Sequence, residues 1–142
     1  MVDELDRKLI SILRKNSRQS SDILGTQLGV DSSTVRRRIK KLVDKGVLTF
    51  YAHPNPDAIG FPVKAIIGLN VETQKMHAIM DALGHREEIR WIYPTTGRFD
   101  IIAMCWFASN QSIYDFLENV IGTVKGVKDT ETFVCLNAPE ES

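Results

Sequence analysis

Five cationic side chains fall within six consecutive positions of this chain, from Arg36 to Lys41. The apolar residues Val35, Ile39 and Leu42 recur among and after them at helical spacing, which predicts a helix with one buried face. Because successive helical residues are about 100° apart, most of the cations lie on the opposite face, where they could bind an anion. A run of charges is equally typical of a solvated helix face, so the run alone does not decide between the two.

The segment before this helix favours the anion-binding interpretation. Residues Ser20–Val30 form a second short amphipathic unit, which Gly29 ends, and the cationic helix then occupies Asp31–Gly46. Two helices joined by a tight glycine turn are typical of a helix-turn-helix, whose second helix enters the major groove of DNA. Gly25 lies inside the first of these helices at a cost of about 1 kcal/mol relative to Ala, which indicates a close approach between them.

Net charge divides the chain in two. The whole sequence is formally neutral, with 18 Lys and Arg against 18 Asp and Glu. Residues 1–50 nevertheless hold 11 cationic and 6 acidic side chains, a charge of +5, whereas residues 51–142 hold 7 and 12, a charge of −5. The neutrality is therefore a cancellation, and the basic first part bears on the choice of partner.

Composition disfavours several classes of protein. No apolar run reaches 18 residues, so we expect no membrane span. No charged-then-apolar leader is visible either, so we expect a cytoplasmic protein. Cys105 and Cys135 lie in apolar strand-like runs without metal-ligand spacing, and we interpret both as buried thiols. The sequence thus implies no metal and no cofactor.

A helix-turn-helix needs a scaffold, which the first 53 residues supply. Apolar residues at helical spacing predict a first helix over about Asp3–Lys15. The β-branched and aromatic run Val47–Tyr51 predicts a short strand that ends before Pro54. Three helices and a strand make a winged helix-turn-helix domain over residues 1–53. Because so small a unit buries little of its surface, we expect it to lean on a partner chain.

Residues 54–62 predict a linker, since they contain three prolines and a glycine, and residues 63–142 predict a second domain. Its strands are expected over Val63–Val71, Ile89–Tyr93, Phe99–Phe107 and Val127–Leu136, with helices over Met76–Leu83 and Ile113–Val124. The order βαββαβ is that of a ferredoxin-like domain. The predicted fold class is therefore α+β, an N-terminal winged helix-turn-helix followed by a C-terminal ferredoxin-like domain.

The predicted strand Phe99–Phe107 is apolar on both faces, with Ile101 and Ala103 on one and Ile102 and Met104 on the other. Two helices cover only one face of a four-stranded sheet. The other apolar face must be buried against something, and a second copy of the chain is the simplest occupant. We therefore expect a homodimer that forms through the sheets.

Two blocks of the sequence resemble the Lrp/AsnC, or feast/famine, family of transcription regulators. The first comprises LDRKLISIL and SSDILGTQLGVDSSTVRRRIKKL, and the second comprises TGRFD and TVKGVKDTETFVCL. The resemblance spans nearly the whole chain, in the family's order. It implies a winged helix-turn-helix joined to an effector domain, and double-stranded DNA as a partner. It also implies dimers that often assemble into tetramers or octamers, and amino acids as effectors.

The family's S-T-V-x-R-R-I block falls on Ser33–Ile39, so the resemblance implies that these arginines meet DNA. Together with the cationic helix it gives one set of candidate DNA-binding residues: Ser33, Thr34, Arg36, Arg37, Arg38, Lys40 and Lys41. We expect Arg36 and Arg37 to donate to guanine edges. Phosphate contacts are expected at Arg38, Lys40 and Lys41.

The family's T-G-x-[FY]-D turn falls on Thr96–Asp100, and in relatives this turn helps to form a small-molecule pocket. Gly97 would let backbone amides approach a ligand carboxylate, and Asp100 could pair with an α-amino group. It is equally open that Gly97 only serves a hairpin turn and that Asp100 only caps it. The candidate effector-binding residues are Thr96, Gly97, Arg98, Phe99, Asp100, Thr130 and Thr132.

Two other functions are considered. An architectural DNA-binding protein with little base preference would use the same cationic surface. Some relatives of this architecture resemble sirohaem decarboxylases, but no histidine and arginine side chains converge in this sequence, so we expect no enzyme activity. The chain departs from the family pattern at Gly25, where relatives usually have Ala, and after Tyr51, where it is one residue shorter.

Overall fold

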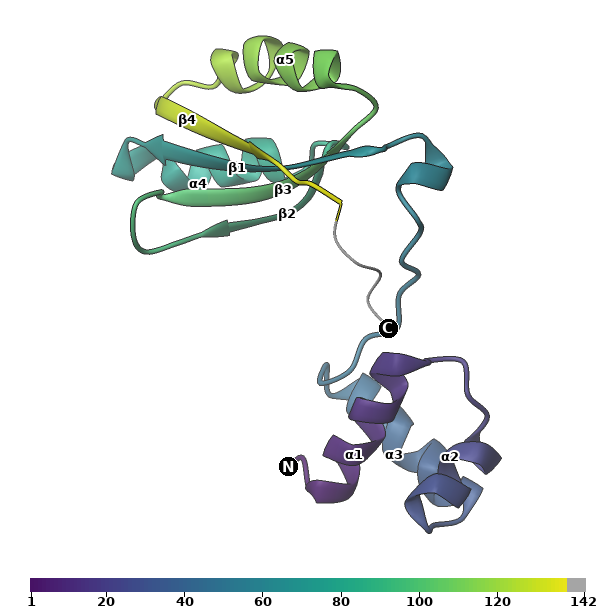
Figure 1. Cartoon of the computed structure of the whole chain (residues 1–142). Helices are drawn as coiled ribbons and strands as arrows, with labels where there is room; N and C mark the ends of the chain where they lie inside the picture. Colours follow the sequence, from purple (N-terminus) through teal and green to yellow (C-terminus); the bar gives the residue numbers. More distant parts are fainter. Residues whose placement is uncertain (138–142) are drawn as a thin grey trace. The chain divides into compact units, whose positions relative to one another are not determined.

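The computed structural model describes residues 1–137 (Figure 1). The end of the predicted second domain, residues 138–142, lies outside the described residues. The chain divides into two compact units, of which the first ends at His53 and the second begins at Pro54. Within the described part, no helix has the length and apolar character needed to cross a membrane.

Three capped helices form the first unit, as predicted. Each follows a residue, Asp3, Ser20 or Asp31, whose side chain accepts a hydrogen bond from the backbone of the first turn. Such a cap satisfies an amide that the helix itself leaves unpaired. The second helix ends at Gly29, whose φ of 71° favours glycine. The helices are α1 (Glu4–Lys15), α2 (Ser21–Leu28) and α3 (Ser32–Asp44).

A small apolar core joins these helices. Its most buried members are at most 4% exposed, and each helix contributes at least one. They are Leu9 and Leu13 of α1, Leu24 of α2, and Val35 and Leu42 of α3. This core fixes α3 by its apolar face, so the opposite face of α3 is directed away from the unit.

Gly25 of α2 lies against the turn that leads into α3. A β-carbon at this position would be 2.5 Å from the carbonyl oxygen of Val30, which is closer than real β-carbons come to any atom. The close approach predicted from Gly25 is therefore present, and it is made by backbone. An alanine at this position would force the backbone of the α2–α3 turn to shift.

The predicted strand at Val47–Tyr51 is wrong, because this segment has no regular secondary structure. The amides of Val47 and Leu48 both donate to the carbonyl of Leu42, which closes the end of α3. The four strands of the one sheet in the described part all come from the second unit, so no strand pairs with this segment. Residues that favour strands form one only where a neighbouring strand accepts their hydrogen bonds.

The proline-rich segment 54–62 contains one short element, the 3-10 helix η1 (Asp57–Ile59). Gly60 ends it with a φ of 93°. The amide of Phe61 then donates to the carbonyl of Pro56 at 2.8 Å, which folds the segment back on itself before the first strand.

Antiparallel strands and two α-helices form the second unit in the order βαββαβ, which confirms the α+β prediction. The strands lie side by side in the order β2-β3-β1-β4 (Figure 1). The elements are β1 (Val63–Val71), α4 (Met76–Gly84), β2 (Ile89–Pro94), β3 (Ile101–Phe107), α5 (Asn110–Asn119) and β4 (Val127–Val134). Strand β3 begins later than predicted, because Phe99 belongs to the preceding turn, and β4 ends before the predicted Leu136.

One face of this sheet carries the core of the second unit. Ile67, Leu69 and Ala103 point to this face and are at most 2% exposed. Ile79 of α4 and Phe116 of α5 are buried against it. Burial of each leucine, isoleucine or phenylalanine side chain here stabilises the unit by about 1.5–3 kcal/mol. Both helices are therefore held on the same side of the sheet.

The opposite face carries apolar side chains that neither helix covers. Residues paired across neighbouring strands share a face, so Met104 lies beside Ile66 and Trp91. Ile102 is paired with Tyr93 in the same way. Trp91 is 40% and Tyr93 61% exposed. We refer to these five residues as the bare sheet face, which has the two-sided apolar character predicted for β3.

The two cysteines differ in their surroundings. Burial raises the pKa of Cys105 to about 12, with the charge of Glu88 as a smaller cause, so this thiol stays protonated. Cys135 is exposed, so the prediction of two buried thiols is wrong for this residue. It follows the end of an edge strand, where neither helix covers it. Among the described residues, no three His, Cys, Asp or Glu side chains are grouped to hold a metal ion.

Candidate nucleic-acid interface

Asp31 fixes the first turn of α3. Its carboxylate accepts hydrogen bonds from the backbone amide of Thr34 at 2.7 Å and from the hydroxyl of Ser33 at 2.9 Å. Hydrogen bonding from Thr34 is the largest cause that holds the pKa of Asp31 below its ordinary value. Ser33 is exposed and Thr34 half-buried, so both predicted residues lie at the start of the exposed face.

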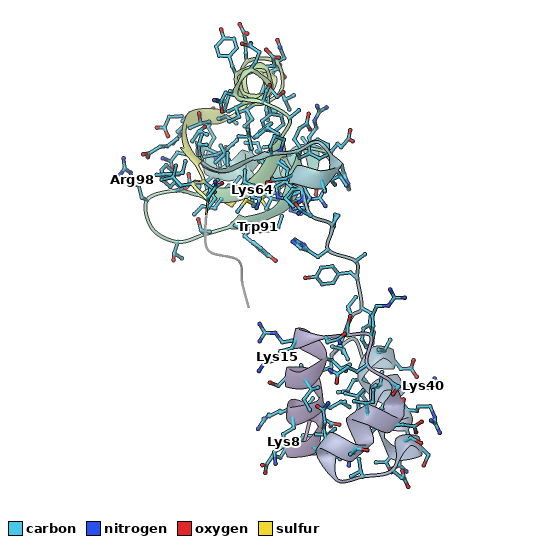
Figure 2. The ribbon with its side chains drawn as sticks, turned by 45° about the vertical axis from the view of Figure 1, so that its right-hand side comes forward. Lys8, Lys15, Lys40, Lys64, Trp91 and Arg98 are labelled. Carbon is cyan, nitrogen blue, oxygen red and sulfur yellow. The ribbon has the colours of Figure 1, made fainter. Side chains whose placement is uncertain are left out.

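The exposed face of α3 carries four of the predicted cations. Arg36, Arg37 and Lys41 are exposed, and none of them forms an ion pair with a described residue. Lys40 pairs with Asp44 at 2.6 Å, yet its side chain remains 76% exposed and projects outward (Figure 2). An exposed pair of this spacing contributes only about 0.3–0.5 kcal/mol, so a phosphate competes with it readily.

Arg38 has different surroundings from the other cations of α3. Its guanidinium pairs with Asp3 and, at 3.2 Å, with Asp6, both at the start of α1. The same carboxylates cap α1 reciprocally, because the amide of Asp6 donates to Asp3 at 2.9 Å and the amide of Asp3 donates to Asp6 at 3.1 Å. The hydrogen bond from Arg38 is the main reason why the pKa of Asp3 falls to about 2. Arg38 thus joins α3 to α1.

This arrangement gives no support to the expected phosphate contact of Arg38, because two carboxylates already occupy the guanidinium. The D-x-x-D spacing of Asp3 and Asp6 is visible in the sequence as a cap. Its cationic partner is on another helix, however, and nothing local in the sequence identifies it. Sequence reasoning therefore missed both acids as neighbours of the candidate interface.

The second predicted site is the turn between β2 and β3. Gly97 has a φ of 100°, and a β-carbon there would meet nothing within 4 Å, so the tip is open to solvent. Thr95 closes the turn, because its amide donates to the carbonyl of Asp100 at 2.9 Å and its hydroxyl to that of Phe99 at 2.7 Å. The amides of residues 96–98 donate no hydrogen bond to a described residue.

Asp100 fastens this turn to the end of β1. One of its carboxylate oxygens accepts a hydrogen bond from the amide of Val71 at 2.9 Å, where the pairing of β1 with β4 shifts register. Its own amide donates to the carbonyl of Leu69 at 3.0 Å and to the side chain of Asn70 at 3.2 Å. The sequence leaves open whether Asp100 binds a ligand or only caps the turn. This geometry gives a capping role to one of its two carboxylate oxygens.

Phe99 and Arg98 lie on the same side of the sheet as the bare sheet face. A β-carbon at Gly68 would lie 2.6 Å from the ring of Phe99, so this ring occupies the space that the glycine leaves. The ring also meets Phe133 edge-on, with centroids 6.3 Å apart. Arg98 pairs with Glu131 at 3.4 Å. The turn is thus joined to two residues of β4 that sequence reasoning missed.

Thr130 and Thr132, the other two effector candidates, lie on the helix-covered face. They pair across the sheet with Leu69 and Ile67, whose side chains are fully buried in the core. Because alternate residues of a strand face opposite sides, the threonines point away from the turn. Within one chain, therefore, Thr96–Asp100 are the only effector candidates that lie together, and Thr130 and Thr132 lie on the other face of the sheet.

Both units match models of known protein families. A model described as winged helix-turn-helix DNA-binding matches residues 2–49, and one described as Lrp/AsnC ligand binding domain matches residues 64–142. The second match alone covers more than half of the chain. The chain belongs to the Lrp/AsnC family. The resemblance stated from the sequence and the predicted winged helix-turn-helix are thereby confirmed.

Relatives and solved structures of the Lrp/AsnC family align over most of the chain. The HTH-type transcriptional regulator Ptr1 of Methanocaldococcus jannaschii is 37% identical over 122 residues, which cover 85% of this chain and 82% of the relative. The structure of E. coli AsnC is 26% identical and covers 100% of this chain and 97% of its own, with a TM-score of 0.88.

A second Lrp/AsnC structure carries a ligand. It is the feast or famine regulatory protein of M. tuberculosis complexed with L-methionine, which is 26% identical, with a TM-score of 0.87 over 97% of this chain and 94% of its own. With both family models matched and the relatives named as regulators, the present protein is a transcriptional regulator of Lrp/AsnC type with a ligand-binding domain.

Proposed function

We propose that this Lrp/AsnC regulator recognises specific sequences of double-stranded DNA by placing α3 in the major groove. The observation that carries the proposal is the exposed face of α3, where Arg36, Arg37 and Lys41 have no internal ion pair. A helix with its side chains is about 10–12 Å across, and the major groove of B-DNA is about 12 Å wide. The width and the exposed cations of α3 therefore both suit the major groove.

The side chains of this face differ in what they can recognise. Arginines suit paired donation to guanine edges, lysines suit phosphates, and hydroxyls suit either. The proposed DNA contacts are Ser33, Thr34, Arg36, Arg37, Lys40 and Lys41. We assign a positioning role to Arg38, because its pairs with Asp3 and Asp6 hold α3 against α1.

A dimer that forms through the bare sheet face is the second part of the proposal. Contiguous exposed apolar side chains on a sheet mark an interaction surface, and a second copy presents the same surface about a twofold axis. Two α3 helices related by such an axis would bind half-sites one or more helical turns apart, on a pseudo-palindromic site.

An amino acid bound at the turn Thr96–Asp100 is the third part. The unused amides of residues 96–98 suit a carboxylate, and the second carboxylate oxygen of Asp100 suits an α-amino group. The relative from M. tuberculosis complexed with L-methionine supports this class of ligand.

Selection of bound fragments from random DNA tests the first part. With the selected site, Arg37→Ala is expected to cost about 1–3 kcal/mol and to relax the preference at one position. Lys41→Ala should weaken all sequences alike. Lys125→Ala, in the second unit, serves as the control and should change nothing. If selection recovers no preferred sequence, or if Arg37→Ala weakens all sequences alike, the protein binds DNA as an architectural protein.

Thermal shift with each of the twenty amino acids tests the effector site. At least one is expected to raise the melting temperature. Asp100→Asn should abolish that shift, because it retains an acceptor for the amide of Val71 and removes only the charge. Asp57→Asn is the matched control and should leave the shift intact. The site is abandoned if no amino acid produces a shift, or if Asp100→Asn preserves it.

A further inference from the structure

The first unit has more exposed cations than its own acids can pair with. Almost every acid of this unit is already engaged within it, either in an ion pair or in a helix cap. The engaged acids are Asp3, Glu4, Asp6, Asp31 and Asp44. The remaining cations are available to an external anion, and all of them except Lys45 fall into two groups.

One of these groups is the α3 face already described, and the other lies on and just after α1. Its members are Arg7, Arg14, Lys15 and Arg18, which are exposed and form no ion pair with a described residue. At about 100° per residue, Arg7, Arg14 and Lys15 lie on the side of α1 that faces away from the leucines it buries, and Arg18 follows in the turn after the helix. Arg14 follows Arg7 by seven positions, which is about 10 Å along the helix axis. We call these four residues the α1 face.

The two groups point in different directions. Lys15 of the α1 face projects on one side of the first unit, as does Lys8, which pairs with Glu4, whereas Lys40 projects from α3 on the opposite side (Figure 2). The core explains this divergence, because both helices direct their apolar faces inward against the same leucines and valine. A duplex that holds α3 in its major groove therefore leaves the α1 face exposed to solvent.

We propose that the α1 face binds the phosphates of a second segment of double-stranded DNA, so that one unit can hold two duplex segments together. The inference rests on the proposed function, because it takes α3 to be occupied by the first segment. DNA is the favoured occupant because it carries one negative charge per about 1.7 Å of its axis, a far denser anion than a folded protein surface. Contacts to phosphates make this second site independent of sequence and sensitive to salt.

The test uses the full chain and two measurements. The first is the affinity for one short duplex that contains a single selected site. The second is the capture of a free labelled duplex by protein already saturated with an immobilised duplex. Arg14→Gln/Arg18→Gln removes two charges from the α1 face. Lys125→Gln/Lys128→Gln removes two exposed charges from the second unit and is the matched control.

The α1 variant should bind the short duplex within about twofold of the wild type. Its capture of the second duplex should weaken about 30-fold at 0.15 M salt, because each lost phosphate contact removes about 0.9 from the logarithmic salt slope. The control variant should match the wild type in both measurements. Both outcomes together support the inference.

Several outcomes would overturn it. Capture by the α1 variant at wild-type strength would show that a second α3 of the oligomer, not α1, holds the second duplex. An equal loss in both measurements would place the α1 face in the same site as α3. A change in oligomer size without DNA, with capture intact, would identify an acidic surface of another copy as the partner.

The proposed function fails separately. Arg36→Gln/Arg37→Gln should lose the short duplex, and wild-type binding by this α3 variant would refute the role of α3 whatever α1 does. Conversely, if the α3 variant loses the short duplex while the α1 variant still captures the second, the regulator proposal stands and only the α1 inference falls.

Discussion

The two units of this chain leave different kinds of surface unsatisfied. The first packs a few leucines and valines inside and exposes cations such as Arg36 and Arg37. The second has a larger core on one side of its sheet and exposes apolar side chains such as Trp91 and Tyr93 on the other. A chain with no net charge can therefore present a polyanion-binding surface and an apolar pairing surface at once.

The difference between the units means that solution conditions act on them separately. Exposed charges are screened over about 8–10 Å at moderate salt, which weakens contacts to phosphate. Apolar burial has no such dependence and is strengthened by some salts.

Salt should separate the two surfaces by the largest margin. If a dimer makes about 6–10 phosphate contacts, its affinity for DNA should fall about 10³–10⁵-fold between 50 and 200 mM salt. Light scattering over the same range should show a constant oligomer size. DNA binding that does not respond to salt would contradict phosphate binding by the first unit. An oligomer that salt dissociates would contradict apolar pairing through the second unit.

A charge on the bare sheet face should have the next largest effect. Met104→Lys would place an unpaired cation in the expected interface, at a cost of about 3–5 kcal/mol per buried charge. The measured change is a smaller species in light scattering at micromolar concentration. Tyr114→Lys is the control, because this residue is 58% exposed on α5 and does not belong to the bare sheet face. A dimer that survives Met104→Lys would mean that another surface pairs the chains.

Core truncation should show whether the units unfold separately. Leu24 is fully buried in the first unit, and Leu24→Ala should cost about 2–5 kcal/mol. Both tryptophans, Trp91 and Trp106, belong to the second unit, so their fluorescence reports on that unit alone. Circular dichroism should therefore show an earlier loss of helix while the fluorescence transition stays in place. Ile79→Ala should shift the fluorescence transition instead, and a joint shift in both variants would indicate one cooperative structure.

Acid should remove the smallest contribution, the pair between Arg38 and Asp3. The pKa of Asp3 is lowered from 3.8 to about 2, so the pair stabilises the fold fully above pH 4 and is lost as the pH falls toward 2. Asp3→Asn should therefore melt below the wild type at pH 7, and the two melting temperatures should converge near pH 2. A difference that persists at pH 2 would mean that the asparagine disturbs the helix cap rather than the ion pair.

Local patterns predicted most of the elements. The three helices of the first unit follow from apolar spacing together with the caps Asp3, Ser20 and Asp31, all of which act within one turn of the chain. Strand β1 has the predicted bounds, because Pro62 precedes its apolar run and Glu72 follows it. Gly25 was informative for the same reason, since the backbone that it meets lies only a few residues away.

The features that the sequence could not predict depend on distant parts of the chain. Val47–Tyr51 has the composition of a strand, but whether it forms one depends on a pairing partner. The position of Arg38 in the sequence predicts a DNA contact, and only the folded structure shows that Asp3 pairs with it. Thr130 and Thr132 share a strand with Glu131 and Phe133, and only the register with β1 determines which pair faces the turn.

Gly68 has a further consequence for the second unit. The ring of Phe99 occupies the volume in which any other residue would keep its β-carbon, so even Gly68→Ala would displace that ring. Phe99 belongs to the turn proposed to bind the small molecule, and Gly68 pairs with Ile102 on the side of the sheet proposed to bind the second subunit. The shape of the proposed ligand-binding turn and the shape of the proposed dimer surface therefore cannot be altered independently.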